Sequence, residues 1–187
     1  MIWAVWITGL PGSGKTVIAQ KVRRILEERG IVSGSVKVLE LDEIRRFITP
    51  QPTYSDEERE LVYASLVYMA KILVECGTPV IIDATANRRK YRERARETIP
   101  NFAEVYVKCS LGTCMEREGQ RKAKYAPSGI YNKAMDKGAT VPGVNVPYEE
   151  PKKPEVVVNS ETMSVKACAE KVVEFILKNH DLKKKML

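Results

Sequence analysis

Residues 9 to 16 read GLPGSGKT and match the pattern GxxxxGK[ST] at every fixed position. Glycines at this spacing let backbone N–H groups turn inward around phosphate oxygens, because no Cβ stands in the way. An apolar run precedes the loop and a helix-like stretch follows it, which is the context that such a phosphate-binding loop requires. Lys15 is then expected to reach the β- and γ-phosphates of ATP, and Thr16 to ligate Mg²⁺. The predicted nucleotide-binding set is Gly9, Pro11, Gly12, Ser13, Gly14, Lys15, Thr16 and Val17.

Two aspartates follow predicted strands, Asp42 after SVKVLEL and Asp83 at the end of VIID. The carboxyl ends of parallel strands line the crevice where ligands bind in sheets of this kind. Transfer of a phosphoryl group needs one group to orient the acceptor hydroxyl and another to hold the Mg²⁺ shell. We assign Asp42 to the acceptor and Asp83 to the metal's water shell, although spacing alone leaves these two roles exchangeable. The alternative is that each aspartate caps the helix that follows it.

Arginines near these aspartates could bind an anionic substrate. Arg45 follows Asp42, Arg59 lies one turn into the next predicted helix, and the planar guanidinium suits phosphate or sulfate oxygens. We predict that both act in catalysis, the alternative being solvated surface side chains. Arg117 is predicted to close on the phosphates or to lie against the adenine of the nucleotide. The basic run from 88 to 96 is expected to be mostly a charged helix face.

The elements that position these residues follow from apolar patterning. Runs at 2–8, 35–41, 80–83, 103–109 and 155–159 predict strands, and helical patterns lie between them. From about 125 to 154 prolines and glycines replace periodicity, which is typical of a lid. We predict an α/β fold of the P-loop NTPase, nucleotide-kinase-like class: a three-layer sandwich with a five-stranded parallel sheet. Residues 1–187 would form a single domain with a lid and acceptor segment at about 119–153.

Composition limits the function. The net charge of +7 favours an anionic partner, and the single histidine excludes a histidine metal cluster. The four cysteines lack CxxC spacing and are expected to be reduced thiols. No apolar run is long enough to cross a membrane, and the N-terminus does not resemble a secretory signal. We therefore expect a cytoplasmic protein without a membrane partner.

These residues resemble the adenylylsulfate (APS) kinases, which make 3′-phosphoadenylylsulfate (PAPS) from ATP and APS. The stretch WITGLPGSGKTVIA looks like the opening of that family. LELDEIR resembles its LDGD-x-x-R segment, which implies the acceptor roles of Asp42 and Arg45. YSDEER is similar to its FS-x-x-DR, which places Tyr54 and Arg59 at positions that contact APS. Members of the family are often dimers, so the resemblance also implies a homodimer.

The resemblance continues over most of the chain. Arg89, Arg92 and Arg96 match the spacing of the family's SPYR-x-x-R-x-x-AR. FAEVYVKCSLGTCMER is similar to its FxEVYV…L-x-x-C-x-x-R, and GIYNKA and PYEEP match the end of its lid. The implied activity is phosphorylation of the 3′-hydroxyl of APS by a phosphotransferase that uses an alcohol as acceptor, in sulfate assimilation.

Departures from the family pattern fall mainly on the acceptor side. The replaced family positions are acidic, glycine, amide, proline, aromatic and lysine residues. The residues that replace them here are Glu40, Leu41, Val62, Asn87, Arg88, Ser128 and Val141. Among them, Val62 stands for an asparagine that contacts APS, and Val141 for a phenylalanine expected to stack on its adenine. The ATP-binding motif is unchanged, so the donor chemistry is more strongly indicated than the acceptor.

Two alternatives therefore remain. DATANRRKYR resembles the D-x-T-N…R stretch of polynucleotide kinases and of the kinase acting on seryl-tRNA, which would make the acceptor a nucleic acid end, an aminoacyl-tRNA or another small alcohol. The other alternative is a nucleotide switch or RNA-binding protein that transfers nothing. No RNA-binding motif supports it, and an aromatic content of 7% offers few stacking platforms.

Overall fold

The computed structural model of the chain describes residues 2–32, 35–120, 125 and 129–184. Its centre is a parallel sheet of five strands in the order β2-β3-β1-β4-β5. The strands are β1 (Ala4–Thr8), β2 (Lys37–Glu40), β3 (Val80–Asp83), β4 (Phe102–Lys108) and β5 (Val156–Asn159). This arrangement confirms the predicted five-stranded parallel sheet, and each predicted run agrees with its strand to within two residues at each end.

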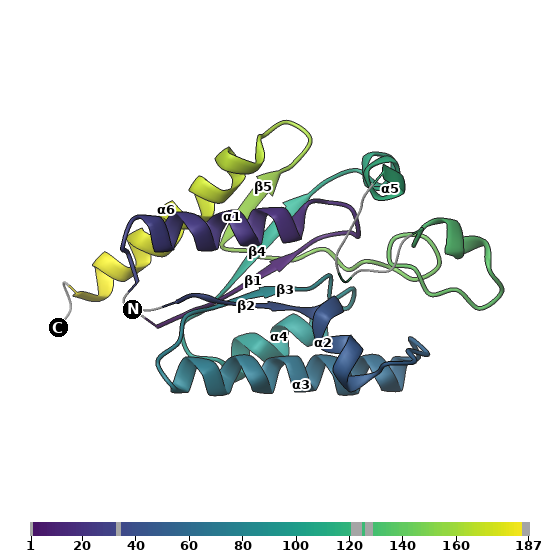
Figure 1. Ribbon diagram of the computed structural model, residues 1–187, viewed down its shortest axis with the longest axis horizontal. Coiled ribbons are helices and arrows are strands. Elements are labelled where there is room, and N and C mark those ends of the chain that lie inside the picture. Colours follow the sequence, from purple (N-terminus) through teal and green to yellow (C-terminus); the bar gives the residue numbers. More distant parts are fainter. Residues whose placement is uncertain (1, 33–34, 121–124, 126–128, 185–187) are drawn as a thin grey trace.

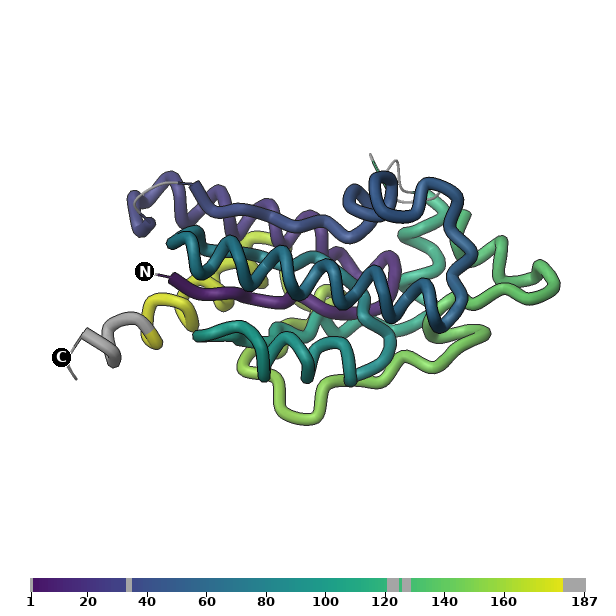
Figure 2. The backbone as a smooth tube through the Cα atoms, turned by 90° about the horizontal axis from the view of Figure 1, so that it is seen from below, coloured from purple at the N-terminus to yellow at the C-terminus, as the bar shows by residue number. Residues whose placement is uncertain are grey.

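Helices cover both faces of the sheet and complete the predicted three layers (Figure 1). On one face lie α1 (Lys15–Glu28) and α6 (Val165–Lys184), and on the other α3 (Asp56–Glu75) and α4 (Arg89–Thr98). Viewed from below, α3 and α4 run side by side (Figure 2). None of the helices in the described ranges is long and apolar enough to cross a membrane.

The central strand β1 shows why its run is apolar throughout. Its side chains alternate between the two faces, and all five residues are buried. Val5 and Ile7 pack into the cluster under α1 and α6, whereas Ala4 and Trp6 pack into the cluster under α3 and α4. A strand covered on both faces has no polar side, so it reads as a continuous apolar run.

The predicted position of Asp42 at the end of a strand is wrong. β2 ends at Glu40, and Leu41 begins a short helix, α2 (Leu41–Ile48), which places Asp42 in its first turn. Leu39 and Leu41 both pack into the same core cluster, so the alternation of apolar residues continues across the point where the backbone becomes helical. The strand register pairs Glu40 with Asp83 at the end of the sheet.

The lid lies beyond the carboxyl ends of the strands, opposite the N-terminus (Figure 1). It follows α5 (Leu111–Gln120) and leads to β5. In its described part, from 129 to 155, the regular structure consists of a short 3-10 helix, η1 (Asn132–Met135), and a bridge between Pro142 and Val146. This position brings the lid to the edge of the sheet where ligands bind in such folds.

Candidate functional site

The phosphate-binding loop joins β1 to α1. Gly14 is the N-cap of α1 with a left-handed backbone (φ 94°), and Lys15 is the first helical residue. The Lys15 side chain is nearly buried, and its Nζ donates to the Leu10 carbonyl oxygen at 2.9 Å. The hydroxyl of Ser13 is buried without a hydrogen-bond partner among the described residues. A helix N-terminus, an ammonium group and an unsatisfied hydroxyl together suit an anionic phosphate chain.

Gly12 is in close contact with α5. Its φ is +80°, and a Cβ built on it would lie 2.3 Å from the carbonyl oxygen of Cys114. Main-chain atoms cannot move aside as a flexible side chain can, so glycine is required at this position for two reasons, its backbone angle and its packing. α5 therefore supports the loop.

Gly12→Ala is expected to weaken ATP binding at least tenfold and to lower the melting temperature. A left-handed residue with a Cβ costs about 1–2 kcal/mol, and the clash with Cys114 adds to that cost. Calorimetric titration with ATP and thermal denaturation measure both effects. Gly112→Ala is the matched control, because Gly112 lies in α5 and has open space where a Cβ would stand. Equal ATP affinity in the two variants would contradict this account of the loop.

Asp83 ends β3 beside the phosphate-binding loop, as predicted. The Thr16 hydroxyl and the Lys15 charge both act on its carboxylate and favour its ionised form. Burial raises the pKa of Asp83 to about 6, and the charges of Asp42 and Glu40 also raise it, against the opposing effects of Lys15 and Thr16. A bound cation would favour the ionised form of this carboxyl, which burial disfavours in the free protein.

These oxygen donors fit Mg²⁺ held together with a substrate. The hydroxyl of Thr16 and the carboxylate of Asp83 are the ligand type that Mg²⁺ prefers. Within the described ranges, no group of three or more His, Cys, Asp or Glu side chains could hold a metal ion alone. One hydroxyl and one carboxylate are too few to hold Mg²⁺ alone, and they suit a site in which phosphate oxygens of the substrate complete the coordination.

A cavity of about 830 Å³ joins the loop to the predicted acceptor residues. Asp42, although it lies on α2 instead of at a strand end, still lines this cavity. The predicted site residues that share its wall are Pro11, Lys15, Thr16, Val17, Asp42, Arg45, Arg59 and Asp83. The donor loop, the two aspartates and the two arginines that the sequence singles out therefore surround one space.

Arg45 is neutralised by a neighbouring carboxylate. Its Nη1 lies 2.7 Å from Glu58 Oε1, and both side chains are nearly buried. Against the opposing effect of burial, hydrogen bonds from Thr53, Arg45 and Tyr54 lower the pKa of Glu58 below its usual value. Ser55 caps α3 by accepting from the Glu58 N–H, and the Glu58 carboxylate accepts from the N–H groups of Thr53 and Tyr54 in the preceding turn.

The turn held by Glu58 presents Tyr54 to the cavity. Tyr54 has a positive φ of 56°, which is costly for an aromatic residue. The Arg45 guanidinium carbon lies 5.0 Å from the centre of its ring, and the Arg59 guanidinium carbon lies 5.8 Å away. Backbone strain held in place by several contacts is typical of ligand sites. Tyr54 therefore lines the cavity with an aromatic ring flanked by two cations.

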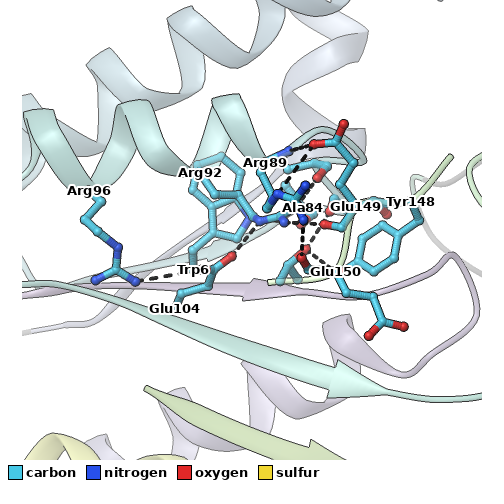
Figure 3. Close-up of polar contacts among 12 residues, drawn as sticks. Trp6, Ala84, Arg89, Arg92, Arg96, Glu104, Tyr148, Glu149 and Glu150 are labelled. Carbon is cyan, nitrogen blue, oxygen red and sulfur yellow. Dashed lines mark hydrogen bonds and ion pairs between the residues drawn. The ribbon is translucent and has the colours of Figure 1, made fainter. Parts of the chain in front are cut away.

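Arg92 is an exception to the charged helix face predicted for most of the run 88–96, whose other arginines are partly exposed. Its side chain is 2% exposed, and its Nε lies 2.5 Å from Glu104 Oε1 on β4. Its Nη1 donates to the Ala86 carbonyl. Its Nη2 donates to the Glu149 carbonyl, and Figure 3 shows Arg92 between Glu104 and Glu149. Arg92 thus fixes the end of the lid to the sheet. No local pattern marks this role, because Glu149 lies 57 residues away in the sequence.

The lid also contacts the phosphate-binding loop directly. The Tyr131 hydroxyl donates to the Pro11 carbonyl at 2.8 Å. Tyr131 and Val141 pack with Cys109 and Cys114 in a small apolar cluster beneath the lid. Tyr131 is absent from the predicted site residues, although the motif GIYNKA that contains it is a signal for this segment.

Arg117 lies on α5, one turn after Cys114, which contacts Gly12 of the phosphate-binding loop. It does not line the cavity in the described part of the chain, and its Nη2 donates to the Ser160 carbonyl at 2.9 Å. Among the departures from the family pattern, Val62 is completely buried in the core under α3, whereas Val141 lines the cavity. Ser128 lies outside the described residues.

Comparison with known proteins gives a consistent result. The model of a family described as adenylylsulphate kinase matches residues 2–159. The adenylyl-sulfate kinase of Bacillus velezensis is 36% identical over 177 residues, covering 92% of this chain and 83% of that protein. The adenylyl-sulfate kinase of Halothermothrix orenii is 32% identical over 173 residues, covering 92% of this chain and 88% of that protein.

Solved structures agree with the sequence relatives. The Mycobacterium tuberculosis APS kinase CysC, in complex with AMPPNP and APS, superposes with a TM-score of 0.80 at 30% identity. That match covers 93% of this chain and 96% of the other. A gluconokinase from Sinorhizobium meliloti, 18% identical with a TM-score of 0.64, shows only that the fold is shared.

Proposed function

Because this chain belongs to the adenylylsulphate kinase family, we propose that it transfers the γ-phosphate of ATP to the 3′-hydroxyl of APS, giving PAPS and ADP. It is a phosphotransferase with a hydroxyl acceptor. The observation that carries the proposal is the cavity in which the phosphate-binding loop faces Asp42, Arg45 and Arg59. Donor and acceptor groups must share one enclosed space for in-line transfer.

On the donor side, backbone N–H groups of residues 9–16 and the Lys15 ammonium bind the triphosphate. Lys15 stabilises the charge that develops on the transferred group. Thr16 and Asp83 would hold Mg²⁺, which neutralises phosphate charge when it is bound. Tyr131 closes the lid against the loop and limits the access of water.

On the acceptor side, Asp42 orients the 3′-hydroxyl and accepts its proton. Tyr54 offers its ring to the adenine of APS, and Arg45 acts through that ring because its own charge is matched by Glu58. Arg59 supplies a positive charge to the anionic part of APS. Arg117 lies on α5, the helix that contacts the phosphate-binding loop at Gly12, and it binds the nucleotide in this proposal while Ser160 fixes its guanidinium.

The acceptor can be identified by following ADP release with purified protein, ATP and Mg²⁺. APS is expected to give turnover well above the background rate of ATP hydrolysis, and adenosine 5′-phosphate, which lacks the sulfate, is the matched control. A 5′-hydroxyl oligonucleotide and seryl-tRNA test the alternative acceptors. Turnover with either of these but not with APS would reject the proposal.

The remaining parts of the proposal rest on the sequence patterns and, for the homodimer, on the resemblance. The whole chain, residues 1–187, acts as one kinase domain with its lid at about 119–153. The protein works in the cytoplasm as a homodimer on small nucleotide substrates, without a nucleic acid partner.

A further inference from the structure

Arg59 differs from Arg45 in how its charge is balanced. It lines the cavity, is 6% exposed, and has no carboxylate within ion-pair distance in the described part of the chain. Its hydrogen-bond acceptors are neutral oxygens. Burying a guanidinium without a counter-charge costs free energy. An anion that enters the cavity would reduce that cost by pairing with Arg59.

The neutral acceptors of Arg59 come from three separate segments. Its Nε donates to the Tyr54 carbonyl at 2.9 Å, and its Nη1 donates to Asn87 Oδ1 at 3.4 Å. Its Nη2 donates twice to the lid, to the Thr140 carbonyl at 2.7 Å and to Thr140 Oγ1 at 2.9 Å. Four of the five N–H groups of a guanidinium are thereby oriented by protein atoms.

Asn87 extends this contact to the far end of the lid. Its side chain is buried, and Nδ2 donates to the Pro147 carbonyl at 3.3 Å. Its own carbonyl accepts from the Glu149 N–H at 2.7 Å. Together with Thr140, Asn87 connects Arg59 to both sides of the bridge between Pro142 and Val146. The lid is held over the cavity partly through the same side chain that carries the uncompensated charge.

We propose that Asn87 and Thr140 are positioning residues that direct the Arg59 cation toward an anionic group of the acceptor, and that their bonds to Arg59 hold the lid in place. The first half rests on the proposed function, because it requires an anionic acceptor. The second half concerns the protein without substrates. Both halves follow from one arrangement: neutral acceptors fix the direction of the guanidinium and leave its charge available.

Asn87→Asp tests the charge. The substitution keeps an oxygen next to Arg59 Nη1 but adds a carboxylate that neutralises the guanidinium, as Glu58 does for Arg45. The KM for APS is expected to rise at least tenfold, while the KM for ATP changes less than twofold. Asn132→Asp is the matched control, since it adds the same charge at an exposed lid position that does not line the cavity. An unchanged KM for APS, or equal changes for both substrates, would overturn the charge role.

Thr140→Val tests the lid in the absence of substrates. The valine has the same shape but removes one of the two lid acceptors of Arg59. Amide hydrogen exchange in residues 129–146 is expected to become about tenfold faster, the effect of one hydrogen bond to a charged group. Thr140→Ser should restore slow exchange, and Thr162→Val, at an exposed position beyond β5, should leave it unchanged. Unchanged exchange in Thr140→Val would overturn the lid role.

The two measurements separate this inference from the proposed function. If APS is not turned over by the unaltered protein, the proposed function fails, and the exchange experiment still decides whether Arg59 holds the lid. If APS is turned over and neither Asn87→Asp nor Thr140→Val has its expected effect, the inference fails alone. Thermal denaturation of each variant shows that it is folded before either result is interpreted.

Discussion

Lys15→Ala is expected to lower kcat/KM for phosphoryl transfer by a factor of about 10²–10³, the loss typical of removing one preorganised group that stabilises developing charge. Lys15 is nearly buried at the start of α1, with its ammonium bonded to the Leu10 carbonyl inside the loop. Its charge also lowers the pKa of Asp83, so the variant holds Asp83 protonated to higher pH. Steady-state ADP release with saturating ATP and varied acceptor measures the loss.

Lys21→Ala is the matched control for this experiment. Lys21 lies on the same helix, α1, but does not line the cavity among the described residues. The control is expected to keep kcat/KM within twofold of the unaltered protein. Turnover of Lys15→Ala equal to that of Lys21→Ala would remove the donor-site assignment.

Asp83→Asn is expected to have opposite effects on activity and stability. Activity should fall at least a hundredfold, because the carboxylate that would hold Mg²⁺ with Thr16 is lost. Stability at pH 8 should rise by about 3 kcal/mol at most in a buffer free of Mg²⁺ and nucleotide, since the variant no longer has to ionise a buried carboxyl. The amide oxygen of asparagine can still accept from Thr16.

The direction of the pH dependence follows from the raised pKa. The folded protein holds a proton on Asp83 up to about pH 6, whereas the unfolded chain releases it near pH 3.8. The free energy of unfolding therefore falls as the pH rises between these values, and the full cost is present above pH 6. The advantage of Asp83→Asn should be largest at pH 8 and small at pH 4.

Urea denaturation at the two pH values measures this difference. Asp136→Asn, at an exposed position in the lid, is the control and is expected to change stability by less than about 0.5 kcal/mol at either pH. An Asp83→Asn variant that is less stable than the unaltered protein at pH 8 would show that the buried carboxylate is not a cost to the fold.

The sheet could be predicted well because its strands are buried on both faces. The apolar run at Val80–Asp83 has the bounds of the observed strand, and β1 begins only two residues later than its run predicts. The error at Asp42 arises where a strand turns directly into a helix with no glycine or proline between them. Leu39 and Leu41 remain buried on the same side through that change, so apolar alternation cannot locate it.

The site could be predicted in its residues but less well in their roles. Lys15, Thr16 and Asp83 follow from a motif and a strand end, which are local signals. The roles of Arg45 and Arg92, by contrast, depend on carboxylate partners that the fold brings in from another element. The contact between Arg59 and the lid joins residues 81 positions apart in the sequence, and no local pattern near either residue predicts it.

The anchors of the lid lie outside the lid itself. Asn87 and Arg92, which hold residues 147 and 149, belong to the stretch between β3 and the middle of α4. A chimera that exchanged only the loop after α5 for that of another kinase would therefore carry a lid without the residues that bind it to the rest of the fold. To accommodate a new acceptor, the loop and the stretch between β3 and the middle of α4 have to be exchanged together, so the loop alone is not a transferable module.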